Sequence, residues 1–224
     1  MANASLGGNG ADSNCLTNFN DLFHQAFCRT VAAGVPVVVA AMNNAVNAAN
    51  GIPATYEEVI TVSALADSDG LPGGLGPATR RGPDESLASF SNFGADVDIA
   101  APGVTVLSTV PTGGCNLCNP TGFGLADGTS MAAPHVAGAA ALYLVNNPGA
   151  SPAQVKSALL KGREQIALRN DPDGINEGVL HVADASTPGN PPPPEVGPPP
   201  VDDTPPPTTH HKKKKKGKKK KRKQ

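Results

Sequence analysis

Tryptophan is absent from this sequence of 224 residues, and aromatic residues make up only 4% of it. The chain has no run of about 18 apolar residues, so no segment is predicted to span a membrane. Residues 1–8 lack a basic region followed by an apolar core, so no signal peptide is predicted there. Small residues are abundant instead, with 25 glycines among them. They favour a close-packed domain in which helices cover a parallel sheet.

Cysteine is sparse as well, and its four copies fall into two local pairs, Cys15 with Cys28 and Cys115 with Cys118. An even count at short spacing predicts two disulfides in an oxidising compartment. Free thiols are an alternative for both pairs. For Cys115 and Cys118, half of a metal site or a redox motif is a further alternative, although no second Cys-x-x-Cys accompanies it.

Charge divides the chain into unlike parts. Residues 1–186 carry 16 acidic and 7 basic side chains, whereas residues 210–224 hold 11 of the 18 basic ones. Between them, residues 188–207 contain eleven prolines. We therefore predict a folded domain at 1–186, a disordered proline-rich linker at 187–209 and a disordered polybasic tail at 210–224. The tail suits weak binding of polyanions, or it is a solubilising or artefactual extension.

Within residues 1–186, apolar runs alternate with segments of helical periodicity. Val35–Ala41 and Val59–Leu65 are continuous apolar runs, which is typical of strands buried on both faces. Phe19–Ala33 repeats apolar residues at helical spacing. Three more strands and two more helices are expected at Ala2–Leu6, Val97–Ala101, Val104–Thr109, Thr129–Asn146 (with Pro134 in or near its first turn) and Ser151–Lys161. The alternation predicts an α/β domain with a mostly parallel sheet.

The most informative stretch is Gly128-Thr129-Ser130-Met131-Ala132-Ala133-Pro134-His135-Val136-Ala137-Gly138. It places the hydroxyl of Ser130 at a helix N-terminus, where unpaired N–H groups and the helix dipole favour a developing negative charge. The plainer interpretation is a serine that only caps a helix packed through small residues. The whole string resembles the nucleophile motif of the subtilisin-like serine proteases (subtilases). The resemblance implies that Ser130 is the nucleophile.

Further blocks resemble the same family in the family's order. The segment that contains Ser5, Leu6 and Gly7 is similar to the substrate-binding strand, so the resemblance implies that these residues line a groove for an extended polypeptide. Residues 37–44 are similar to the strand that delivers the asparagine of the oxyanion hole, and Asn43 takes that place. Met42 departs from the pattern, which has glycine there. We expect the methionine side chain, or a shifted register that brings Asn44 into place of Asn43, to narrow the specificity pocket or to misplace the amide.

Residues 52–62 match another block, whose backbone carbonyls bind a cation in some relatives. The resemblance therefore implies a structural calcium ion as an option, although the reaction itself requires no cofactor. An ordinary turn at the end of a strand is the alternative role for Asn43. Residues 87–94 and 98–103 match two further blocks and are interpreted as packing and turn elements. Asp96, Asp98 and Asp127 are assigned to turns and to the solvated surface.

The chain contains neither the aspartate motif nor the histidine motif that subtilases place before the substrate-binding strand. His135 lies five residues after Ser130, about 500° around the helix, so it points elsewhere, and no motif surrounds His24 or His181. We therefore expect the C-terminal part of the catalytic domain. Its fold is a three-layer doubly wound mostly parallel sheet, subtilisin-like, with the N-terminal strands missing and the first strand exposed as an edge that invites aggregation.

Two functions follow. The first is a secreted serine endopeptidase that transfers an acyl group to Ser130, acts on polypeptides, is monomeric when complete and is inactive in this form. The second is a non-catalytic remnant that binds polyanions through its lysine-rich tail.

Overall fold

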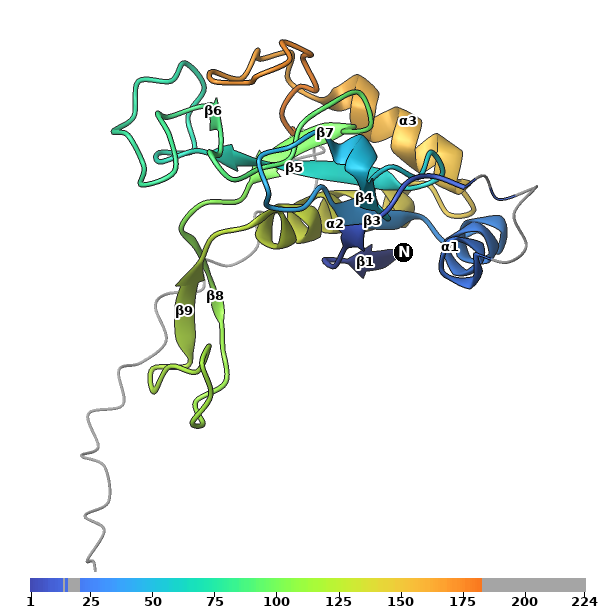
Figure 1. Ribbon diagram of the computed structural model, residues 1–224, viewed down its shortest axis with the longest axis horizontal. Coiled ribbons are helices and arrows are strands. Elements are labelled where there is room, and N and C mark those ends of the chain that lie inside the picture. Colours follow the sequence, from blue (N-terminus) through green and yellow to red (C-terminus); the bar gives the residue numbers. More distant parts are fainter. Residues whose placement is uncertain (14, 16–20, 183–224) are drawn as a thin grey trace, which may run out of the picture. The chain divides into compact units, whose positions relative to one another are not determined.

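The computed structural model describes residues 1–13, 15 and 21–182 (Figure 1). The predicted domain end at 186, the linker and the polybasic tail lie outside these residues. The elements, in chain order, are β1 (Ala2–Ala4), β2 (Gly8–Asn9), α1 (Leu22–Ala32), β3 (Val37–Ala40), the short 3-10 helix η1 (Ala48–Asn50), β4 (Gly51–Ile52), β5 (Ile60–Ala66), β6 (Ser86–Leu87), β7 (Ile99–Pro102), β8 (Val106–Thr109), β9 (Phe123–Ala126), α2 (Thr129–Asn146) and α3 (Pro152–Gly162).

The main sheet is parallel, as the long apolar runs predict. Its strands lie in the order β1-β3-β5-β7, and the two-residue β6 pairs antiparallel with the end of β5. Val38 on β3 faces Ile60 on β5, and Val62 on β5 faces Ile99 on β7. All residues of β3 and β5 are buried, because helices or loops cover both faces.

Side chains of the sheet alternate between two apolar clusters. Val38 and Val62 belong to the larger cluster, which they share with α2 and α3. Val37 and Val39 point the other way and pack with Phe27 and other residues of α1. The sheet is therefore the middle of three layers, and the predicted α/β class is confirmed.

Helix α2 lies against the sheet through its small residues. Ala132, Ala133, Val136 and Ala140 are buried at helical spacing, and α2 contacts β1, β3, β5 and β7. Short side chains allow the helix axis to come close to the strands, which fixes the position of its first turn. No helix in the described part of the chain combines the length and the apolarity that crossing a membrane requires.

Two local features differ from the sequence prediction. Val104–Thr109 is not a strand of the main sheet, because β8 leaves it and pairs antiparallel with β9, which the sequence did not reveal. This largely exposed hairpin projects from the body of the domain (Figure 1). Cys115 and Cys118 form a disulfide in the connection between the two strands, and Cys15 and Cys28 form the other predicted disulfide.

The turn before α2 is anchored by a buried carboxylate. Asp127 accepts hydrogen bonds from Arg80 (2.8 Å), Arg81 (2.7 Å) and the backbone N–H of Thr105 (2.8 Å). Burial by itself would raise the pKa of Asp127, but these bonds outweigh it and lower the pKa to about 2. The segments around residues 80 and 105 are thereby tied to the residue that precedes Gly128.

Helix α3 begins with a capping box at Ser151, which gives a test of the fold. The Ser151 hydroxyl accepts the backbone N–H of Gln154 at 3.3 Å, and the Gln154 side chain accepts the Ser151 N–H at 2.8 Å. Ser151→Ala should lower the free energy of unfolding by about 1 kcal/mol in urea titrations. Ser157→Ala, on an exposed position of the same helix, should leave it unchanged or raise it slightly. Equal effects of the two substitutions would contradict the cap.

The lowered pKa of Asp127 predicts that the stability of the fold depends on pH. The pKa of Asp127 is lower in the folded chain than the ordinary value of 3.8. Its contribution to the free energy of unfolding is therefore fully present above about pH 5 and is lost as the pH falls toward 2. Asp127→Asn should lower the free energy of unfolding at pH 7 and reduce its fall between pH 5 and pH 2. Chemical denaturation at several pH values measures both effects. Glu57→Gln, at an exposed carboxylate, should preserve the parent profile.

Candidate active site

Ser130 is the second residue of α2, in the first turn that the Gly128 cap begins. Gly128 has φ +155°, a backbone conformation that residues other than glycine rarely adopt. The sharp turn into the helix therefore depends on this glycine. Because Ser130 is in the first turn, its backbone N–H has no acceptor within the helix. Its hydroxyl donates to the carbonyl of Ser5 at 3.3 Å.

Ser5 also compensates for a proline inside the helix. Pro134 lies beyond the first turn, deeper than the sequence suggests, and it has no N–H to donate to the carbonyl of Ser130 four residues earlier. The Ser5 hydroxyl donates to that carbonyl at 2.9 Å instead. The segment after β1 and the start of α2 are thus joined by two reciprocal hydrogen bonds.

Asn43 lies beside Ser130 because its amide oxygen is hydrogen-bonded to Thr129, the residue that precedes Ser130. This oxygen accepts the backbone N–H of Thr129 at 2.9 Å and the Thr129 hydroxyl at 3.0 Å. A backbone N–H can only donate, so the amide oxygen faces Thr129 and the NH₂ group is left to donate elsewhere. That nitrogen lies near Gly128, 3.7 Å from the position that a β-carbon would take there.

Asn92 holds the loop that carries Asn43, although the sequence assigns it only to the packing block at residues 87–94. Asn92 is 1% exposed, and its backbone N–H donates to the carbonyl of Met42 at 3.0 Å. Its side-chain oxygen accepts the N–H groups of Asn44 (3.0 Å) and Val46 (3.3 Å). Nothing in its sequence context, Ser91-Asn92-Phe93, distinguishes a clamp on a distant loop from an ordinary turn residue.

The five predicted site residues border one cavity of about 370 Å³. The residues that line it are Ser5, Leu6, Gly7, Ala40, Met42, Asn43, Asn44, Thr129 and Ser130. The segment after β1, the loop after β3 and the first turn of α2 therefore meet at one place, although they are far apart in the sequence. Leu6 and Asn43 are exposed at this cavity, so it is open to solvent.

Met42 adopts a backbone conformation that is unusual for its side chain, with φ +78°. Its side chain packs where glycines leave room. A β-carbon on Gly7 would lie 2.8 Å from the Met42 Cγ, and one on Gly51 would lie 2.6 Å from its sulfur. Asn43, rather than Asn44, is hydrogen-bonded to Thr129, so the register is not shifted. Met42 occupies space at the wall of the cavity.

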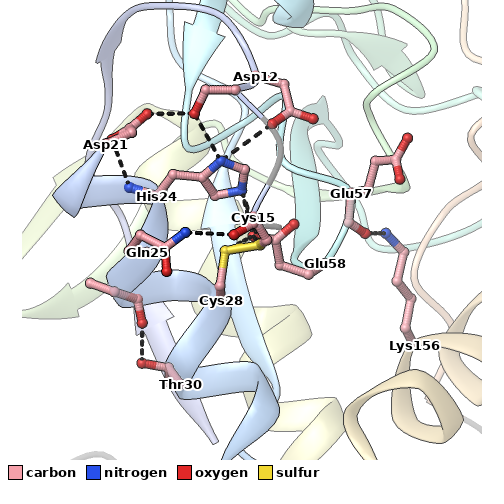
Figure 2. Close-up of polar contacts among 12 residues, drawn as sticks. Asp12, Cys15, Asp21, His24, Gln25, Cys28, Thr30, Glu57, Glu58 and Lys156 are labelled. Carbon is pink, nitrogen blue, oxygen red and sulfur yellow. Dashed lines mark hydrogen bonds and ion pairs between the residues drawn. A yellow bond between two sulfur atoms is a disulfide. The ribbon is translucent and has the colours of Figure 1, made fainter. Parts of the chain in front are cut away.

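None of the described histidines lines this cavity. His135 is exposed and its Nδ1 lies 2.9 Å from the carbonyl of Met131, while His181 pairs with Glu164 at 2.9 Å. His24 is 1% exposed, and its two ring nitrogens lie 2.6 Å from Glu58 and 3.3 Å from Asp12 (Figure 2).

The buried His24 belongs to a structural cluster. Its ring stacks on Tyr56 with a centroid distance of 3.7 Å and an interplanar angle of 9°. Cys15 and Cys28 lie in the same cluster, beside Glu58 (Figure 2). Four groups of this kind resemble a metal-ligand set, but the disulfide between the two cysteines removes the thiolates that would bind the metal.

The block at residues 52–62 already holds a positive charge. The Lys156 ammonium donates to the carbonyl of Glu57 at 3.3 Å (Figure 2). It also donates to the carbonyl of Val59 at 2.6 Å and pairs with Asp98 at 2.8 Å. Burial raises the pKa of Asp98, and the charge of Lys156 opposes this effect. An ammonium and a divalent cation compete for the same oxygens, so these carbonyls do not fit the structural calcium ion that the resemblance implies for this block.

Comparison with known proteins identifies the family of the chain. Residues 1–180 match the model of the subtilase family. The chain is 38% identical to a subtilisin-like protease of Coccidioides posadasii over 172 residues, which are 75% of this chain and 34% of that protein. It is 35% identical to an extracellular protease of Xanthomonas campestris over 188 residues, which are 84% of this chain and 28% of that protein.

Solved structures show the same likeness. A cold-adapted subtilisin-like serine proteinase superposes with a TM-score of 0.60 at 30% identity, over 80% of this chain and 54% of that one. A protease of Pseudoalteromonas arctica gives a TM-score of 0.61 at 31% identity, over 81% and 48% of the two chains. The chain thus spans about half of these structures and about a third of the curated relatives. Because the family model matches residues 1–180 and solved subtilisin-like structures superpose on the chain, the chain belongs to the subtilase family.

Proposed function

We propose that this chain is the part of a serine endopeptidase that carries the nucleophile, Ser130, and the oxyanion-stabilising amide, Asn43. The observation that carries the proposal is the Asn43 amide, which is fixed through its oxygen to Thr129 so that its nitrogen is free to donate beside Ser130. The family membership supports serine peptidase chemistry in general.

In the proposed reaction, the Ser130 oxygen attacks the carbonyl carbon of a peptide bond and loses its proton to a base. Negative charge develops on the carbonyl oxygen, where it is met by the Asn43 NH₂ group, the Ser130 N–H and the positive end of the α2 dipole. The base then gives the proton to the leaving amine, and water hydrolyses the acyl group from Ser130. We propose that the base and its orienting aspartate come from sequence outside these 224 residues, so that the chain by itself is inactive.

The segment Ser5–Gly7 is proposed to bind an extended polypeptide substrate along the cavity. Leu6 and Gly7 are exposed there, and the backbone of an extended segment offers N–H and C=O groups to a substrate strand. Met42 lies at the wall of the same cavity, where its side chain would narrow the space for a substrate side chain. Two disulfides and an extracellular relative support secretion.

The test of this proposal uses the protein expressed from its complete reading frame. Asn43→Ala should lower kcat about 100- to 1000-fold on a peptide substrate with little change in KM. Asn43→Asp keeps the acceptor for Thr129 but lacks the donor, so it should lower kcat without lowering the melting temperature. Ser130→Ala should abolish the burst of acyl-enzyme. Asn44→Ala is the matched control and should remain active; a burst that persists in Ser130→Ala would refute the assignment.

The alternative function, polyanion binding by residues 210–224, is favoured only by their composition. These residues carry 11 basic side chains and no aromatic ones, so binding would be electrostatic and would weaken steeply with salt. Truncation after Ser186 should abolish retention on an anionic resin, because the remaining residues have a formal charge of −9. Retention of the truncated chain would show that the tail is not the binding element.

A further inference from the structure

Three carboxylates converge in the loop after α3. The loop reads Asp171-Pro172-Asp173-Gly174-Ile175-Asn176-Glu177, and one oxygen each from Asp171, Asp173 and Glu177 lies within 4.8 Å of the other two. Hydrogen bonds within the loop hold this shape, since Asp173 accepts the Ile175 N–H at 2.8 Å and Asn176 accepts the Gly178 N–H at 3.0 Å.

Glu177 is the residue that sets this group apart from an ordinary acidic surface loop. Its side chain is buried, with 2% of the residue exposed, and neither carboxylate oxygen has a hydrogen-bond partner in the described part of the chain. A buried polar group without a partner is costly, and a buried carboxylate is more costly still.

No described cationic side chain forms an ion pair with any of the three carboxylates. The guanidinium of Arg163 donates through Nη1 to the carbonyl of Asp98 at 2.9 Å, and its buried Nε has no hydrogen-bond partner among the described residues. Burial first, and then the charges of Asp171 and Asp173, raise the pKa of Glu177 to about 7, although its own backbone N–H and the charge of Arg163 oppose the shift. The three carboxylates therefore disfavour one another's charge in the absence of a further positive charge.

We propose that Asp171, Asp173 and Glu177 bind a hard divalent cation, for which Ca²⁺ is the best fit. All the donors are oxygens, which suits Ca²⁺ rather than a transition metal. Two oxygens bound to one calcium ion at about 2.4 Å are at most about 4.8 Å apart, which the observed spacing satisfies. Calcium also accepts irregular geometry, so loop carbonyls and water complete the six to eight ligands it usually takes.

A cation at this site would hold the last described segment on the sheet. Gly178, next to Glu177, accepts the N–H of Ala100 on β7 at 2.9 Å, and Ala100 accepts the N–H of Leu180 at 2.8 Å. Glu177 is therefore next to a short parallel extension of the sheet, whereas Asp171 and Asp173 lie in the loop. Binding would crosslink the loop to this extension and stabilise the folded state.

A second acidic cluster in the same domain provides the contrast. Asp84 is buried beside Asp67 and Asp69, but its oxygens accept the N–H groups of Ser68 (2.8 Å) and Gly76 (2.9 Å). The hydrogen bond from Ser68 leads the effects that lower the pKa of Asp84. That carboxylate is satisfied by the chain itself and requires no cation.

The experiment uses the protein from its complete reading frame, stripped with EDTA and titrated with CaCl₂ by calorimetry, with melting temperatures measured in parallel. Glu177→Gln and Asp173→Asn should each bind one calcium ion fewer than the parent. They should also lose part of the calcium-induced rise in melting temperature, about 5 °C or more when calcium is at 100 times its Kd. Asp69→Asn, in the other cluster, should match the parent in both measurements.

Stability without calcium separates a cation site from a merely structural role. Glu177→Gln removes a buried charge, so without calcium it should melt at or above the parent temperature, whereas loss of a structural contact would lower it with and without calcium. Asp173 is exposed, and the amide oxygen of asparagine can still accept the Ile175 N–H, so Asp173→Asn should not disturb folding. The proposal is overturned if Glu177→Gln binds as many calcium ions as the parent, or if the parent shows no calcium-dependent rise.

Discussion

The packing of α2 against the parallel sheet is the constraint on which the candidate active site depends. Alanines such as Ala132 and Ala140 let the helix approach the strands closely, and close packing of this kind leaves little freedom to slide. The first turn of α2 is thereby fixed beside the end of β3, where the chain bends into Asn43. A serine at a helix N-terminus becomes a candidate nucleophile here because of what the sheet places next to it.

Side chains then satisfy the backbone groups that this arrangement leaves open. Asn43 binds an N–H of the first turn of α2, and Ser5 binds the carbonyl for which Pro134 has no donor. Asn92 does the same for the loop after β3, and Asp127 for the loop around Thr105. Each of these contacts joins segments that are far apart in the sequence, so hydrogen bonds hold the loops of the site where regular secondary structure ends.

Buried acids in the domain differ in how their charge is compensated. Asp84 and Asp127 each accept several hydrogen bonds, which keep their pKa values below the ordinary range. Glu177 has no such partner, and burial raises its pKa instead. The hydrogen-bonded carboxylates of Asp84 and Asp127 therefore stabilise the fold, whereas the buried carboxylate of Glu177 lacks such bonds and favours the binding of a cation.

The sequence by itself determined the α/β class, α2 and the strands with long apolar runs, because burial on both faces and helical periodicity are local patterns. The spacing of the cysteines favours both disulfides but leaves free thiols open, and the structure decides for the disulfides. The sequence also indicated Ser130 and Asn43 through a resemblance. It did not determine the two-residue β6, the β8–β9 hairpin, the clamp by Asn92 or the isolation of Glu177. Those depend on which distant groups meet, and only the tertiary structure decides this, because a hydrogen bond or its absence depends on atoms that the local sequence does not specify.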